Sequence, residues 1–198
     1  MESSLQPAAP AQPRAYDRAT IALHWATAML VVALWVIGQT ADWLPRGPGR
    51  SAYWSTHVVA GFALAAVLLG RLAWRAGAGR VLPLADRGAL HVLAKTTHLL
   101  LYVLLLAVVG LGVLNAFVRG WSVYGLFSLP QLGDAEWRRP ITHWHELAAN
   151  AVLIVALFHA GAALIHHYAW RDGLLARMIP GLGRGAPASL AGNAKGNR

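Results

Sequence analysis

Four long stretches of this chain contain no Asp, Glu, Lys or Arg. They cover residues 21–41, 51–70, 96–118 and 147–170. A helix needs roughly 20 apolar residues to cross the ~30 Å hydrocarbon layer of a bilayer. Every stretch reaches that length, so the sequence predicts an all-α integral membrane protein built as a four-helix bundle.

Residues that are typical of helix ends flank the uncharged stretches. Asp17 is a candidate N-cap for the first helix, and Pro45 and Pro48 interrupt the chain after it. Pro83 lies in the second connection and Pro140 in the third. These signals place the four helices at about residues 17–41, 51–75, 90–118 and 141–171.

The helices are expected to form one domain over residues 15–178. The segment 1–14 is rich in Pro, Ala and Gln, and the segment 179–198 is rich in Gly, Ala and Pro. Such compositions cannot bury enough apolar surface to fold, so both segments are predicted to be disordered tails.

The distribution of basic residues predicts the orientation of the bundle. The chain has 17 Lys and Arg against 8 Asp and Glu, a formal net charge of +9. Twelve of the basic residues lie near the termini or the second connection, and five lie in the other two loops. The positive-inside rule then places both termini in the cytoplasm of a multi-pass protein in the bacterial inner membrane. Because the basic residues form no single stripe, membrane lipid is the expected partner and nucleic acid is not.

Composition excludes several kinds of site. Cysteine is absent, which excludes disulfides, iron–sulfur clusters, thiolate-ligated haem and the C-x-x-C-H attachment of c-type haem. Charged residues make up 13% of the chain and hydrophobic residues 57%. Soluble domains carry about a quarter charged residues, so a soluble fold is not expected.

Four histidines lie in the predicted spans at depths that match in pairs. Ionisable side chains inside a membrane are costly and usually functional. His145 and His159 are fourteen residues apart on the last helix, which is ~21 Å and close to four turns, so both face the same way. The sequence therefore predicts two inter-helix pairs, His57 with His145 on the periplasmic side and His24 with His159 on the cytoplasmic side.

Two histidines that face each other across a bundle can be the axial ligands of haem iron. Two haems stacked across the bilayer would form a transmembrane electron path, and small residues such as Gly61, Gly110 and Gly112 would leave room for them. Two alternatives stay open. The histidines can instead serve as interhelical hydrogen-bonding groups or a proton relay. His98 also lies near the cytoplasmic level and competes with His24 as the partner of His159.

Five segments of the chain, in order and with matching spacing, resemble the bacterial cytochrome b561 family. These segments are residues 16–25, 57–71, 93–102, 144–150 and 159–180. They span nearly the whole predicted domain. The resemblance implies a four-helix inner-membrane cytochrome with two non-covalent haem b groups, and it favours His24 over His98 as a ligand.

The resemblance also implies roles for particular residues. His24 and His159 would hold the cytoplasmic-side haem, and His57 and His145 the periplasmic-side haem. The remaining candidates are contacts for haem propionates or for a quinone: His98, Lys95, Arg71 and His166. Structural hydrogen bonding is the alternative for His98, and snorkelling to lipid phosphates is the alternative for Arg71.

The main functional hypothesis is an oxidoreductase that passes electrons from a periplasmic donor to ubiquinone. Family members include superoxide oxidases, so the donor is superoxide or a periplasmic redox protein. For superoxide, Arg119, Arg138 and Arg139 in the longest periplasmic loop would attract the anion. The second hypothesis is a haem-bearing membrane anchor that exchanges electrons with a dehydrogenase or a soluble cytochrome. The third is a colourless transporter or sensor that uses histidine protonation.

Overall fold

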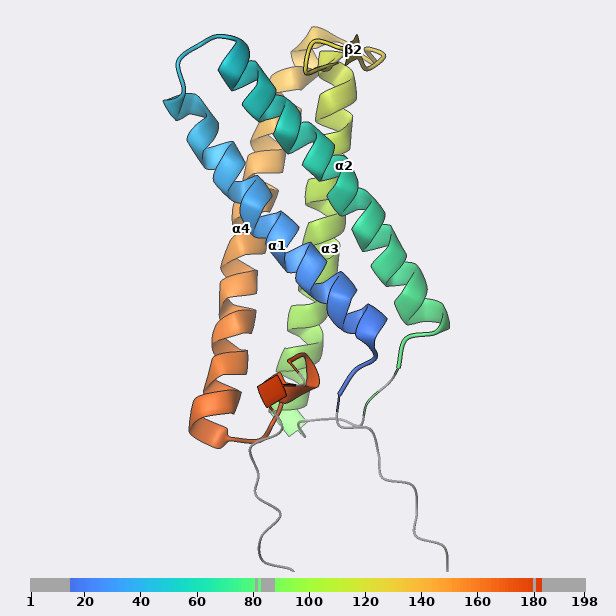
Figure 1. Cartoon of the computed structure of the whole chain (residues 1–198), viewed down its shortest axis with the longest axis vertical. Helices are drawn as coiled ribbons and strands as arrows, with labels where there is room; N and C mark the ends of the chain where they lie inside the picture. The colour runs from blue at the N-terminus through green and yellow to red at the C-terminus, as the bar shows by residue number, and fades with distance from the viewer. Residues whose placement is uncertain (1–14, 81, 83–87, 180, 183–198) are drawn as a thin grey trace, which may run out of the picture.

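Among the residues that the structure describes, four helices are long and apolar enough to span a membrane, and they make up most of the fold (Figure 1). They are α1 (Arg18–Thr40), α2 (Pro48–Gly77), α3 (Gly88–Arg119) and α4 (Arg138–Ile165). The computed structural model describes residues 15–80, 82, 88–179 and 181–182. The predicted tail 1–14 and all but three residues of the predicted tail 179–198 lie outside the described residues. The prediction of an all-α membrane bundle is confirmed.

Short elements join and end the four helices. They are η1 (Ala41–Trp43), β1 (Ser122–Val123), β2 (Phe127–Ser128), η2 (Ala135–Trp137), the π-helical η3 (His166–Trp170) and η4 (Leu175–Arg177). The two strands form an antiparallel hairpin in which Ser122 pairs with Ser128 and Val123 with Phe127. This hairpin and η2 fill the connection between α3 and α4.

The helices pack as two pairs that cross each other (Figure 1), with α1 along α2 and α3 along α4. A small buried cluster joins the pairs and contains Leu68 of α2, Leu105 and Val108 of α3, and Val152 of α4. We call the end of the bundle that holds residues 15–20, 77–80, 88–90 and 166–179 the terminal end. The opposite end, with residues 41–50 and 119–138, is the loop end.

Large apolar side chains on the outside of the bundle are left exposed. Met29 is 71% exposed, Leu157 63% and Phe158 75%. In water such a surface would be costly, because burying apolar area is worth roughly 25 cal/mol per Å². Lipid tails cover these side chains at no such cost, which explains why so few residues of this bundle are buried by protein alone.

Two helices begin three residues earlier than the sequence pattern indicated. α2 begins at Pro48 and α4 at Arg138, with Pro140 in its first turn. Proline is tolerated in a first turn because the N–H that it lacks has no partner inside the helix. The prolines therefore start these helices instead of preceding them.

Asp17 ties the first two helices together at the terminal end. It is the N-cap of α1, as predicted, and accepts hydrogen bonds from the backbone N–H and the hydroxyl of Thr20 at 2.9 and 2.7 Å. Its carboxylate also accepts from Nε1 of Trp74 at 3.0 Å and from the backbone N–H of Arg80 at 3.1 Å. The hydrogen bonds from Thr20 are the main reason why the pKa of the Asp17 carboxyl lies well below its ordinary value.

Replacing Asp17 by Ala is expected to destabilise the bundle by about 1–2 kcal/mol, the range for loss of an N-cap. Because the folded pKa is lowered, the carboxylate stabilises the protein above about pH 4, and this contribution is lost as the pH falls through the folded pKa. Thermal unfolding in detergent at pH 7 and pH 3 measures both effects. Asp134→Ala is the control, since the Asp134 side chain caps no helix. Equal unfolding temperatures for the two variants at pH 7 would contradict the role of Asp17.

Candidate functional site

The first histidine pair joins α2 and α4 toward the loop end. The ring centroids of His57 and His145 lie 6.1 Å apart with an angle of 79° between the ring planes. Both side chains are partly buried between the helices. The depth argument predicted this pair, and the structure brings the two rings together.

The second pair joins α1 and α4 toward the terminal end. The ring centroids of His24 and His159 lie 6.4 Å apart, with 72° between the ring planes. His159 follows His145 by fourteen residues on one continuous helix, a rise of about 21 Å. The bundle thus holds two histidine pairs of similar geometry at two levels.

His98 of α3 lies in the same cluster as the second pair. Its ring centroid is 5.0 Å from that of His159, which is closer than His24. Unlike His24, which is partly buried, His98 is exposed on the surface of the bundle. His24 and His98 are thus both neighbours of His159, and they differ in how far they are buried.

The loop-end pair has the surroundings that an axial ligand needs. Nδ1 of His145 donates to the backbone carbonyl of Val108 at 2.9 Å. This bond fixes the ring and leaves the Nε2 lone pair available for a metal, the arrangement typical of metal-ligating histidines. Helix glycines lie against both rings: a Cβ at Gly112 would be 2.9 Å from Cε1 of His145, and one at Gly38 would be 3.6 Å from Cε1 of His57. The residues at this level fit a haem held by two imidazoles.

Arg71 lies beside the His24–His159 pair and contacts His24 directly. Its Nη2 donates to Nδ1 of His24 at 3.1 Å, and its guanidinium carbon lies 5.3 Å from the centroid of the Tyr102 ring. A guanidinium can only donate, so the neutral His24 ring carries its proton on Nε2. Ligation through Nε2 therefore requires Arg71 to release Nδ1, after which the guanidinium is free to bind a carboxylate. The donor set at this level, two imidazoles from His24 and His159 with the Arg71 guanidinium beside them, also fits haem.

His166 forms a separate polar site where α4 passes into η3. His166 is 7% exposed, its ring centroid lies 4.4 Å from that of Trp170, and its Nδ1 forms a hydrogen bond with the Asp172 carboxylate. Burial raises the pKa of the Asp172 carboxyl, but the hydrogen bonds from His166 and from the backbone N–H of Leu174 outweigh it and lower that pKa. His166 and Asp172 therefore form a polar contact just beyond the end of α4. Lys95, another candidate, is exposed on α3.

Sequence reasoning missed some residues around these sites. A Cβ at Gly61 or Gly110 would meet nothing within 4 Å, whereas Gly38 lies against His57. Only the pairing of α1 with α2 shows the role of Gly38. Asp172 lies beyond the end of α4, so helical periodicity gave no sign that it folds back onto His166.

The comparisons with known proteins agree with this arrangement. The sequence profile of the prokaryotic cytochrome b561 family matches residues 15–181. Cytochrome b562 of Cereibacter sphaeroides is 33% identical, over 85% of this chain and 97% of that protein. Cytochrome b561 homolog 1 of Escherichia coli is 30% identical, over 83% and 97%. A protein of Yersinia pestis named probable superoxide oxidase CybB is 28% identical, over 83% and 96%.

The family match covers all four helices and every histidine described above. Two relatives at 30% identity or more align over nearly their whole length. The chain therefore belongs to the prokaryotic cytochrome b561 family, as a multi-pass electron-transfer protein of the bacterial inner membrane whose class implies haem b.

Proposed function

We propose that this protein moves electrons across the membrane between two haem b groups, from a periplasmic donor to ubiquinone. The observation that carries the proposal is the presence of two inter-helix histidine pairs at two levels of one bundle. A single pair would serve one redox centre on one side of the membrane. Two pairs on a shared helix provide one centre near each face.

Four imidazoles would hold the two groups, His57 and His145 toward the loop end and His24 and His159 toward the terminal end. Haem supplies a one-electron carrier at each pair. With a histidine on both axial positions, each pair would close the iron to direct binding of oxygen or substrate. The protein side chains thereby favour outer-sphere electron transfer over oxygenase chemistry.

The proposed orientation places the terminal end in the cytoplasm. Arg71, Arg75 and Arg80 near the second connection, with the basic residues of the tails, outnumber those at the loop end. His166 and Asp172 then lie near the cytoplasmic face. Reduction of ubiquinone to ubiquinol consumes two electrons and two protons, and the His166–Asp172 contact would lie on the side of the membrane from which those protons are taken. Arg71 and Lys95 would serve as cations for propionates or for the quinone head group.

The name of the Yersinia pestis relative suggests superoxide as the donor. Arg119 ends α3, and Arg138 and Arg139 begin α4, so all three lie at the loop end. A positive field at this end would raise the local concentration of a small anion close to the His57–His145 pair.

Reduction by superoxide in the presence of a soluble ubiquinone analogue tests this function. We expect the haem spectrum of the purified protein to become reduced and ubiquinol to form. Replacing Arg138 and Arg139 by Gln should lower the superoxide rate and flatten its dependence on salt, because screening weakens the same field. An unchanged superoxide rate in this variant would show that Arg138 and Arg139 do not attract the anion to the site. Reduction only by a dehydrogenase or a soluble cytochrome would instead identify the protein as a membrane anchor for such a partner.

Replacing His24 and His98 separately by Ala tests which of them pairs with His159. We expect His24→Ala to lose about half of the bound haem and His98→Ala to keep it, because His24 is held between the helices while His98 is exposed. Haem per polypeptide, quantified as the pyridine complex, measures the outcome. Loss of haem from His98→Ala with retention in His24→Ala would reverse the assignment.

A further inference from the structure

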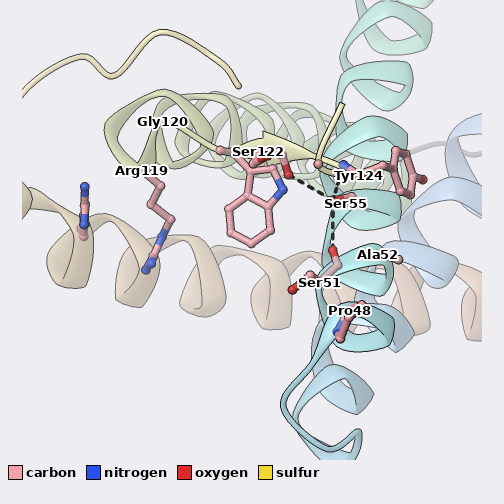
Figure 2. A pocket seen from close by; sticks show the side chains of 11 residues that line it. Pro48, Ser51, Ala52, Ser55, Arg119, Gly120, Ser122 and Tyr124 are labelled. Carbon is pink, nitrogen blue, oxygen red and sulfur yellow. Dashed lines mark hydrogen bonds between the residues drawn. The ribbon is translucent and has the colours of Figure 1, made fainter. Parts of the chain in front are cut away.

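A pocket of about 560 Å³ lies at the loop end, between the first turns of α2 and the hairpin (Figure 2). Ser55 fixes its wall: the hydroxyl contacts the carbonyls of Ser51 and Ser122 at 3.0 and 3.3 Å and accepts from the backbone N–H of Tyr124 at 3.0 Å. These bonds tie the hairpin to α2. The pocket is therefore a built feature of the fold.

Two arginines, Arg119 and Arg138, line this pocket. Among the described residues no carboxylate lies within ion-pair distance of Arg119 or Arg138, whereas nearby Arg50 pairs with Asp42. Neutral groups hold Arg119 in place, since it donates to Asn115 Oδ1 at 3.0 Å and to the Thr142 hydroxyl at 2.8 Å. Two guanidiniums at one pocket repel each other, so an anion between them would be stabilised.

Neutral donors add to the positive character of the pocket. Nε1 of Trp121, a lining residue, is buried and has no hydrogen-bond partner among the described residues. Pro48 and Ser51 belong to the first turn of α2, whose N-cap Gly47 makes no side-chain capping bond. The partial positive charge of this 30-residue helix is therefore directed at the same region.

We propose that the loop-end pocket binds a phosphate group between Arg119 and Arg138. Its volume is far larger than a diatomic anion needs and falls within the ~300–1,000 Å³ range of small-molecule sites. Guanidinium pairs match the oxygens of phosphate in charge and geometry. Because the pocket lies where α2 begins and α3 ends, at the level of the membrane interface, the phosphate comes from an anionic lipid headgroup or from a soluble phosphate.

Two probes distinguish these sources on the full-length, haem-loaded protein. Native mass spectrometry measures retention of phosphatidylglycerol against phosphatidylcholine, and calorimetric titration measures binding of inorganic phosphate. Retention of phosphatidylglycerol without binding of inorganic phosphate identifies a lipid site. Binding of inorganic phosphate identifies a site for soluble phosphates. Either result supports a phosphate site in this pocket if the double variant Arg119→Gln with Arg138→Gln binds the same probe about tenfold or more weakly than the unmodified protein.

The control is Arg46→Gln, which removes one exposed positive charge at the same end without touching the pocket. We expect it to bind as the unmodified protein does. If the double variant does not fold, Arg138→Gln is tested alone, because within the described part of the chain the Arg138 side chain makes one hydrogen bond, to the Val118 carbonyl. Equal binding by the pocket variant and the control, or no binding of either probe to the unmodified protein, would overturn the proposal.

Discussion

Replacing His145 by Ala is expected to halve the haem content of the purified protein, from two groups per chain to one. His145 is held by the Val108 carbonyl and its ring faces that of His57, while the second pair lies about 21 Å away along α4. Loss of one axial ligand therefore leaves the other centre intact. Haem quantified per polypeptide, with the reduced-minus-oxidised spectrum, measures the change.

His143→Ala is the matched control for this experiment. His143 lies two residues earlier on α4, but its side chain is exposed and its ring lies beside Trp144. We expect the His143 variant to keep both haems. Full haem content in His145→Ala, or equal loss in the two variants, would show that the loop-end pair does not hold haem.

Replacing Gly112 by Ala is expected to produce the same loss without removing any ligand. The added Cβ would lie 2.9 Å from Cε1 of His145, closer than side chains tolerate, so the imidazole must move from its position beside the Val108 carbonyl. A ligand displaced in this way binds metal more weakly, by about 10–100-fold for disturbed ligand support. Haem content and the midpoint potential of the remaining centre measure the effect.

Gly110→Ala provides the comparison, since it lies on the same helix and its Cβ would meet nothing within 4 Å. Gly to Ala in a helix interior is otherwise favourable by roughly 0.5–1 kcal/mol. Gly110→Ala is therefore expected to keep its haem and to unfold at the same or a slightly higher temperature. Equal haem content in the Gly112 and Gly110 variants would contradict the close packing of α3 against His145.

The spans and the histidine pairs were predictable because they depend on the chain alone. Absence of charge over about 20 residues defines a membrane helix. A fixed rise per residue then sets the depth of each side chain, so His57 and His145, or His24 and His159, had to meet if the helices pack. The N-cap at Asp17 was predictable as well, because a cap depends only on the three residues that follow it in the sequence.

Features that depend on how the helices pack could not be predicted in this way. The depth of His98 matched that of His24, but only the packed bundle shows that His98 lies closer to His159 and is exposed. Arg71 reaches His24 across 47 residues of sequence. The hairpin that forms the wall of the loop-end pocket lies in a segment with no periodic signal, and its contact with Ser55 spans 67 residues.

The central claim is that each of the two histidine pairs holds one haem b. The most direct measurement is the reduced-minus-oxidised spectrum of the purified full-length protein, with haem quantified per polypeptide as the pyridine complex. We predict two low-spin haem b groups per chain, because each pair offers two imidazoles that close both axial positions. One haem per chain, or none after expression with ample haem, would contradict the claim.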